Sequence, residues 1–287
     1  MKPFILLLCA SALVAAEPDW ARIDKEAVDL LQRYVRVASV NPPADTREAA
    51  ALLKKELEAR GIEAKTYASG PAGQTNLVAR VAGRDRAKKP LVLMNHMDVV
   101  PVDAKSWKVD PFGGVIRDGY LWGRGALDMK CIGVQQLLAL AALKQNGVVP
   151  SRDIVFLATA DEETNGTHGA QWMIDNQRGE VDAEYLLDEG GFGSREVFSG
   201  GKLVFGVAVG EKQPVWLRLR ARGTAAHGSQ PIPDNANDIL LIAIEKARAI
   251  PPPARQHPVV EEMMQAIGTA AQNKFTSAIR RNTASLT

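Results

Sequence analysis

The stretch that decides the fold is residues 154–166, IVFLATADEETNG. Its first five residues are apolar and predict a buried strand. Three consecutive carboxylates follow that strand: Asp161, Glu162 and Glu163. Three negative charges held close together repel one another unless a cation binds to them. We therefore expect a cation site at this end of the strand, and an exposed acidic turn is the alternative interpretation.

Strands and helices alternate along the chain before this stretch. Apolar residues at helical spacing predict helices, and short apolar runs bounded by Gly, Pro or charge predict strands. The expected helices cover residues 21–35, 47–60 and 131–146. The expected strands cover residues 62–67, 76–81 and 91–95, and a hairpin covers 115–122 with its turn at 117–119. This alternation predicts an α/β sandwich.

The sequence changes character near residue 210. Strands are expected over residues 204–209 and 215–221, and an amphipathic helix over 234–248. We therefore divide the chain into an α/β domain, residues 17–209, and a smaller α+β unit, residues 210–287.

The first 16 residues are typical of an export signal. Lys2 precedes an apolar run over residues 4–14, and Ala15 and Ala16 precede the polar Glu17. The run is shorter than the about 20 residues that span a bilayer, although an uncleaved anchor is the alternative. We expect residues 1–16 to be a signal peptide cleaved after Ala16, and the mature protein to be periplasmic or secreted.

Composition narrows the possible functions. The 287 residues are 46% apolar, which excludes a disordered chain. Lys and Arg number 35 against 33 Asp and Glu, so a net charge of +2 gives no reason to expect nucleic-acid binding. Without the signal peptide Cys131 is the remaining cysteine, which excludes an internal disulfide and a thiolate metal site.

Three further polar clusters repeat the placement of residues 161–163. Asp98 follows His96 after the strand 91–94, Asp128 lies in residues 123–130, GRGALDMK, and Asp188-Glu189 follow the apolar residues 185–187. Such strand ends converge on a crevice in α/β sheets. Alone, His96 is typical of a structural histidine and Asp128 of a helix N-cap. Together, one imidazole and several carboxylates form a donor set that suits zinc, or less specifically manganese or cobalt.

The spacing of residues within two of these clusters indicates the roles of individual side chains. Residues two apart on an extended segment point to the same side, so Asp98 can orient His96 as a carboxylate orients a metal-ligating imidazole. Of the adjacent Glu162 and Glu163, one can ligate metal while the other takes a proton from an activated water. Hydrolysis is the chemistry that this arrangement predicts.

In order and spacing, these motifs resemble the di-zinc metallopeptidases that include aminoacylases, glutamate carboxypeptidases, acetylornithine deacetylase and succinyl-diaminopimelate desuccinylase. The resemblance covers residues 20 to 287. It implies a three-layer α/β catalytic domain with a mixed, mostly parallel sheet, and a smaller α+β lid domain that forms a homodimer. It also implies that His96 and Glu189 bind one zinc ion, that Glu163 binds the other, and that Asp128 bridges both.

The same resemblance assigns the remaining site residues. Glu162 is implied as the general base and Asp98 as the residue that orients His96. The peptide bond after Asp128 is implied to be cis. Residues 223–231, GTAAHGSQP, look like the lid motif of the family, whose histidine, here His227, reaches the active site of the partner subunit and holds the developing oxyanion.

One departure from the family concerns its last metal ligand. In the family the catalytic domain resumes after the lid and supplies a final histidine, but the four histidines here, His96, His168, His227 and His257, do not lie in such a segment. We therefore expect a truncated or fragmentary sequence with an incomplete lid. The expected function is an exported zinc hydrolase that cleaves an amide bond in a short peptide or an N-acyl amino acid. The alternative is an inactive remnant that binds metal weakly or acts as an association module.

Overall fold

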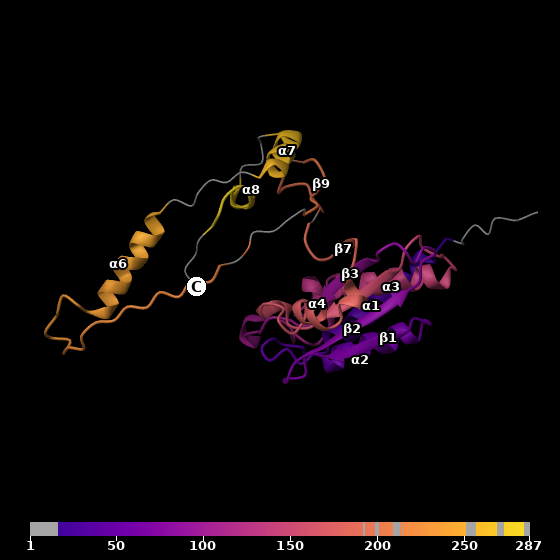
Figure 1. Cartoon of the computed structure of the whole chain (residues 1–287), viewed down its shortest axis with the longest axis horizontal. Coiled ribbons are helices and arrows are strands. Elements are labelled where there is room, and N and C mark those ends of the chain that lie inside the picture. The colour runs from indigo at the N-terminus through magenta and orange to yellow at the C-terminus, as the bar shows by residue number, and fades with distance from the viewer. Residues whose placement is uncertain are drawn as a thin grey trace, which may run out of the picture. The chain divides into compact units, whose positions relative to one another are not determined.

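The computed structural model describes residues 17–191, 193–198, 201–208, 213, 215–250, 257–268 and 273–283. The expected signal peptide, residues 1–16, lies outside the described residues. The chain forms two compact units that meet in the sequence between Glu189 and Gly190, whereas the sequence predicts a boundary near residue 210 (Figure 1). Each unit is described by itself below.

A five-stranded mixed sheet forms the centre of the first unit, in the order β1-β2-β6-β3-β7. Its strands are β1 (Ala64–Ala68), β2 (Thr75–Val81), β3 (Leu91–His96), β6 (Ile154–Thr159) and β7 (Tyr185–Leu187). β3 lies between β6 and β7 and runs parallel to both, while β2 is antiparallel to β1 and β6. The expected hairpin is confirmed as β4 (Val115–Arg117) and β5 (Tyr120–Trp122). The predicted α/β class is thus confirmed.

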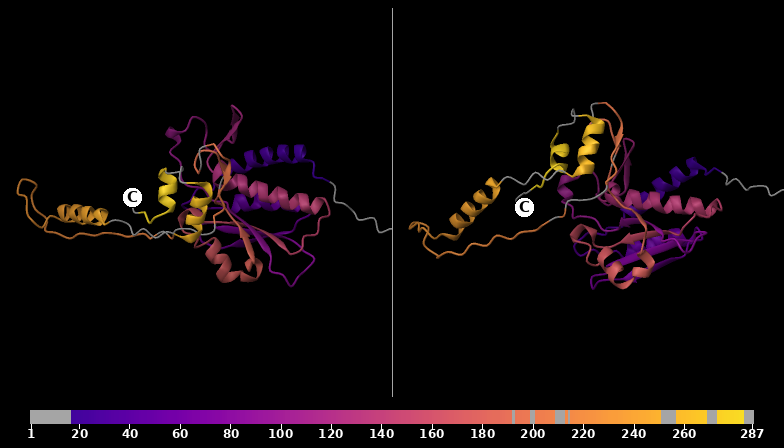
Figure 2. Two further views of the ribbon diagram at one scale, coloured as in Figure 1. Left: turned by 90° about the horizontal axis from the view of Figure 1, so that it is seen from above. Right: turned by 45° about the horizontal axis from the view of Figure 1, so that its top comes forward.

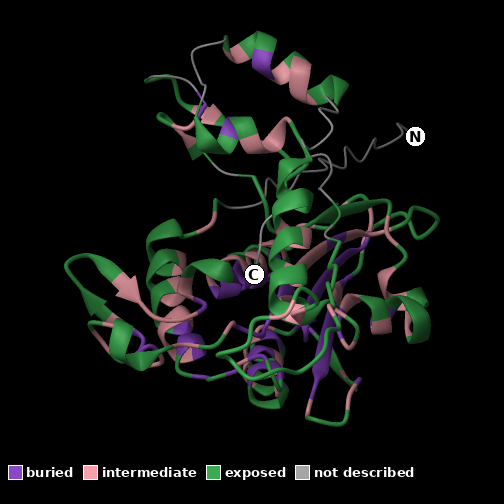
Figure 3. Cartoon of the chain, turned by 90° about the vertical axis from the view of Figure 1, so that its left-hand side faces the viewer, coloured by how far each residue is buried: buried purple, intermediate pink, exposed green. Residues whose placement is uncertain are grey.

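Helices cover both faces of the sheet because its central strands are apolar on both sides (Figures 2 and 3). On β6, Phe156 and Ala158 pack in a core with α1, α2 and α3, while Val155 and Leu157 pack against Met173 of α4. Successive side chains of a strand point to opposite faces, so this alternation builds three layers. The helices are α1 (Trp20–Val35), α2 (Arg47–Glu58), α3 (Cys131–Gln145), α4 (Ala170–Asn176) and α5 (Arg178–Val181).

α3 continues a helical turn, η2 (Ala126–Lys130). Within the described residues this combined segment is the one helix long and apolar enough to cross a membrane by length and composition. Its residues Val134, Leu137 and Leu140 are buried in the core against the sheet. The apolar character of α3 is thus explained by its place in the core.

Among its described residues the second unit contains a short β8–β9 ribbon and three helices. They are β8 (Gly193–Ser194), β9 (Val204–Phe205), α6 (Ala236–Ala249), α7 (Pro258–Ile267) and α8 (Lys274–Ile279). α6 confirms the helix expected over residues 234–248, whereas α7 and α8 were not anticipated. The strand expected over 204–209 is present only as β9, and residue 209 lies outside the described residues.

The strand predicted over residues 215–221 is wrong. All seven residues are described, and they form no strand. Their alternating side chains are exposed, Trp216 at 76% and Leu217 at 83%. An extended segment becomes a strand only when a neighbour pairs with its backbone, and alternation in the sequence does not supply that neighbour.

Candidate metal centre

The ends of three parallel strands bring the predicted site residues together. His96 is the last residue of β3, and the turn η3 (Glu162–Thr164) follows β6. Glu189 lies two residues after the end of β7. Because β6, β3 and β7 are parallel neighbours, their carboxyl ends meet at one edge of the sheet.

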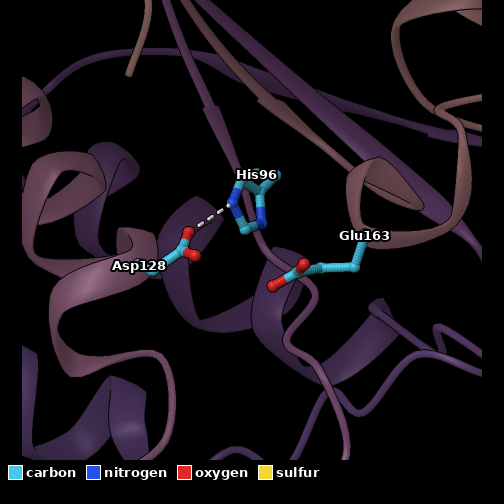
Figure 4. A group of neighbouring side chains, drawn as sticks. All are labelled: His96, Asp128 and Glu163. Carbon is cyan, nitrogen blue, oxygen red and sulfur yellow. Dashed lines mark hydrogen bonds and ion pairs between the residues drawn. The ribbon is translucent and has the colours of Figure 1, made fainter. Parts of the chain in front are cut away.

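The imidazole of His96 is the centre of this cluster. Its Nε2 lies 3.1 Å from Asp128 Oδ1, 3.5 Å from Glu189 Oε2 and 3.9 Å from Glu162 Oε2. Two sets of donor atoms each fit within 4.8 Å: His96 with Asp128 and Glu163, and His96 with Glu162 and Glu189. Figure 4 shows the carboxylates of Asp128 and Glu163 approaching the imidazole from two different segments of the chain. We call these five residues the His96 cluster.

The cluster has a buried floor and a solvent-accessible rim. The His96 side chain is 2% exposed, whereas Asp128 is 67% exposed, Glu162 50% and Glu189 39%. The carboxylates therefore remain accessible to a dissolved ion and to a substrate, while the imidazole is held in place from below.

The loop before α3 presents Asp128. The peptide bond between Asp128 and Met129 is cis, which confirms the bond geometry that the family resemblance implies. Gly125 precedes this turn with φ of +78°, and a Cβ there would lie 2.5 Å from Val99 Cγ1. Only glycine combines this left-handed backbone with such close packing, so Gly125 lets the loop pass beside the segment that follows β3.

Asp98 supports the cluster in two ways. His96 Nδ1 donates to the backbone oxygen of Asp98 at 2.9 Å and lies 3.5 Å from its carboxylate Oδ1. The same carboxylate accepts the backbone N–H groups of Glu162 and Glu163, both at 3.1 Å. Asp98 therefore orients the imidazole, as the spacing predicts, and also holds the turn that carries both glutamates.

Burial and the neighbouring charges shift the pKa values of His96, Glu162, Glu163 and Glu189. Burial raises the pKa of Glu162, and the charges of Asp98 and Asp128 raise it further against the opposing charge of His96. The pKa values of Glu163 and Glu189 are raised by burial and by Asp128. Burial alone would lower the pKa of His96, but the hydrogen bonds and charge of Asp98 outweigh it, and Glu162 adds to them, giving about 10.

A divalent cation fits this donor set. Four carboxylates surround one imidazole, and burial together with the neighbouring negative charges raises the pKa of Glu162, Glu163 and Glu189. A divalent ion would offset those negative charges and take both oxygen and nitrogen ligands, as zinc does. In this structure His96, Asp128, Glu163 and Glu189 are the residues that would hold it, and Glu162 lies beside them.

His227, the remaining residue singled out from the sequence, belongs to the second unit. Its side chain is exposed, and its Nδ1 lies 2.8 Å from Ser229 Oγ. The first unit therefore assembles the His96 cluster from its own residues, and the role of His227 stays a prediction.

Sequence reasoning missed Asn41 and Lys130. Asn41 is 3% exposed and donates to Asp98, and Lys130 is fully buried beneath the loop that carries Asp128. Asn41 precedes two prolines, and no spacing relative to the other polar clusters identifies it as a site residue. The signal that could have marked Lys130 is its position directly before α3, whose residues are mostly apolar.

Lys130 joins the Asp128 loop to the end of α1. Its Nζ donates to the backbone oxygens of Tyr34 at 3.0 Å and Val37 at 2.7 Å, and lies 4.7 Å from the centre of the Tyr34 ring. A cation is well placed at a helix C-terminus, where carbonyl groups lack partners.

Replacing Lys130 by Met should lower the free energy of unfolding by about 2–4 kcal/mol, because two buried carbonyls lose their donor. Urea unfolding followed by circular dichroism measures this loss. The control Lys144→Met changes an exposed residue in the last turn of α3 and should stay within about 0.5 kcal/mol of wild type. Equal stabilities for the two variants would show that the buried ammonium is dispensable.

Comparisons with known proteins identify relatives of this chain. The model of the Peptidase family M20/M25/M40 matches residues 92–284. Aminoacylase-1 of Sus scrofa is 33% identical over 216 residues, which are 75% of this chain and 51% of that protein. The N-fatty-acyl-amino acid synthase/hydrolase PM20D1 of Bos taurus is 35% identical over 176 residues, which are 60% of this chain and 35% of that protein.

A solved structure with similarity to this chain is the M20 family metallo-carboxypeptidase Sso-CP2 from Sulfolobus solfataricus. It is 26% identical, with a TM-score of 0.49 over 57% of this chain and 37% of that one. The chain spans about half the length of the aminoacylases that it matches.

Proposed function

Because the chain belongs to the Peptidase family M20/M25/M40, we propose that it is a zinc-dependent hydrolase that cleaves an amide bond in an N-acyl amino acid or a short peptide. The observation that carries this proposal is the His96 cluster, in which four accessible carboxylates surround one buried imidazole at the carboxyl ends of parallel strands. The names of the two relatives favour an N-acyl amino acid as the first substrate class to test.

Four residues of the cluster are proposed to bind the metal, and one is proposed to transfer the proton. When bound, zinc supplies a Lewis acid that polarises the amide carbonyl and makes water a better nucleophile. His96, Asp128, Glu163 and Glu189 would hold the ion. Glu162 accepts the proton of the attacking water on its carboxylate and passes it to the leaving amine, and its raised pKa suits both steps.

The second unit supplies the proposed subunit contact. Residues 215–219 expose Val215, Trp216 and Leu217 at 74%, 76% and 83%. Exposed apolar side chains of this kind favour association. We propose a homodimer in which His227 acts across subunits, for which mixing inactive Glu162→Ala and His227→Ala chains is the test. Partial recovery of activity supports the trans role, and no recovery despite subunit exchange refutes it.

Export is proposed from the composition of residues 1–16. Their apolar run and the small residues Ala15 and Ala16 support cleavage before Glu17. N-terminal sequencing of the protein recovered outside the cytoplasm should begin at Glu17. A chain that retains Met1 in the cytoplasmic fraction would overturn this proposal.

Metal-dependent hydrolysis is the direct test of the proposed activity. The metal-stripped chain should be inactive toward N-acetyl amino acids and dipeptides, and zinc, cobalt or manganese should restore turnover. A release assay for the free amino acid measures it. Failure of every metal with every substrate would favour the rival function, an inactive remnant that binds metal weakly or associates with partners.

A further inference from the structure

Two buried carboxylates behind the His96 cluster share one amide donor. Asp98 is fully buried and Asp161 is 6% exposed. Asn41 Nδ2 donates to Asp98 Oδ2 at 2.7 Å and to Asp161 Oδ1 at 3.2 Å. A side-chain amide has two hydrogens on this nitrogen, so it can satisfy one oxygen of each carboxylate at once. Buried oxygens depend on such donors because water does not reach them.

These two carboxylates hold the turn that carries the catalytic glutamates. Asp98 accepts the backbone N–H groups of Glu162 and Glu163. Asp161 accepts the Thr164 hydroxyl and the backbone N–H of His168. The bonds to Asp98 fix the backbone of the two glutamates, and the bonds to Asp161 fix Thr164 and His168, which follow them.

Asn41 is itself fixed to the continuation of the strand that carries His96. Its backbone N–H donates to Val99 at 2.8 Å, and Val40 pairs with Val99 as a parallel bridge. Ser39 Oγ donates to the backbone oxygen of Met97. The Asn41 amide is thus placed relative to β3 and reaches across to the turn after β6.

We propose that Asn41 is a positioning residue of the metal centre. It sets the separation between the end of β3, which carries His96 and Asp98, and the turn that presents Glu162 and Glu163. When the Asn41 amide is removed, Asp98 and Asp161 lose the donor that they share. The turn η3 then shifts relative to His96. The inference rests on the proposed function, because it takes the His96 cluster to be a metal site.

Three replacements of Asn41 test this role. Asn41→Asp keeps the shape and adds a third carboxylate, Asn41→Ala removes both donated bonds, and Asn41→Ser keeps one hydroxyl donor. Competition with a chromophoric chelator measures the zinc dissociation constant, and the visible spectrum of the Co²⁺-loaded chain reports ligand geometry. We expect about 10- to 100-fold weaker zinc binding for Asp and Ala, with altered Co²⁺ bands. Asn41→Ser should lie between these variants and wild type.

Asn146→Asp is the matched control. The Asn146 amide donates to the backbone oxygen of Ala142 at the end of α3, so the same change of charge occurs away from the cluster. Its zinc affinity and Co²⁺ spectrum should equal those of wild type. Circular dichroism of the metal-free variants separates loss of folding from loss of metal affinity.

The outcomes distinguish the inference from the function on which it rests. Wild-type zinc affinity and unchanged Co²⁺ bands in the folded Asn41 variants would overturn the role of Asn41 and leave the proposed function intact. Absence of zinc binding by the wild-type chain would overturn the proposed function itself. Loss of folding in all three variants would also count against the inference, because it assigns Asn41 to the site and not to the stability of the unit.

Discussion

Glu162→Gln should lower turnover by about 10²–10⁴-fold while the bound metal is retained. The carboxylate of Glu162 lies 3.9 Å from His96 Nε2 and is half exposed, so it can reach an attacking water. An amide of the same shape does not take up a proton. Turnover of an N-acyl amino acid and zinc per chain, measured by mass spectrometry on the same sample, check both parts of this expectation.

A matched control uses a glutamate remote from the cluster. Glu184 is exposed and forms an ion pair with Arg152, so Glu184→Gln should leave turnover and zinc content unchanged. If Glu162→Gln loses its zinc, the roles of Glu162 and Glu163 are reversed. If it retains both zinc and turnover, Glu162 is not the base.

Asp128→Ala should lose more zinc than His96→Ala, by about tenfold or more in affinity. Asp128 Oδ1 lies 3.1 Å from His96 Nε2, and the donor atoms of Asp128, His96 and Glu163 all fit within 4.8 Å. The family resemblance implies that Asp128 would bridge two ions and that His96 would serve one, so removal of Asp128 would affect both ions. Zinc per chain after dialysis, and the dissociation constant from chelator competition, measure the difference.

The control for this comparison is Asp182→Ala, which removes an exposed carboxylate paired with Lys89. Its zinc content should match wild type. Similar losses for Asp128→Ala and His96→Ala would contradict a bridging role and would favour a single ion bound by both residues.

Much of the first unit could be predicted because its signals are local. Residues 154–158 and 91–94 are short apolar runs, and the acidic or histidine residues that follow them within a few positions reach the site when such strands lie parallel. The hairpin at residues 115–122 carries its turn signal in its own sequence. The position of Asp128 beside His96 came from the family resemblance, because spacing alone leaves an N-cap equally reasonable.

What could not be predicted depends on distant partners. Asn41 lies 57 residues from Asp98 and 120 from Asp161, and its amide bonds exist only when the strands are assembled. Lys130 reaches carbonyls 96 and 93 residues away. The strand prediction for residues 215–221 was wrong for the same reason, because an alternating sequence pattern does not supply a neighbouring strand to pair with.

Zinc binding by the metal-stripped wild-type chain, measured by equilibrium dialysis, tests the central claim that the His96 cluster is a metal centre. We predict saturable binding of at least one zinc ion per chain, weakened by about tenfold or more by Asp128→Ala and unaffected by Asp182→Ala. Failure to bind zinc, or equal binding by wild type and Asp128→Ala, would contradict the claim.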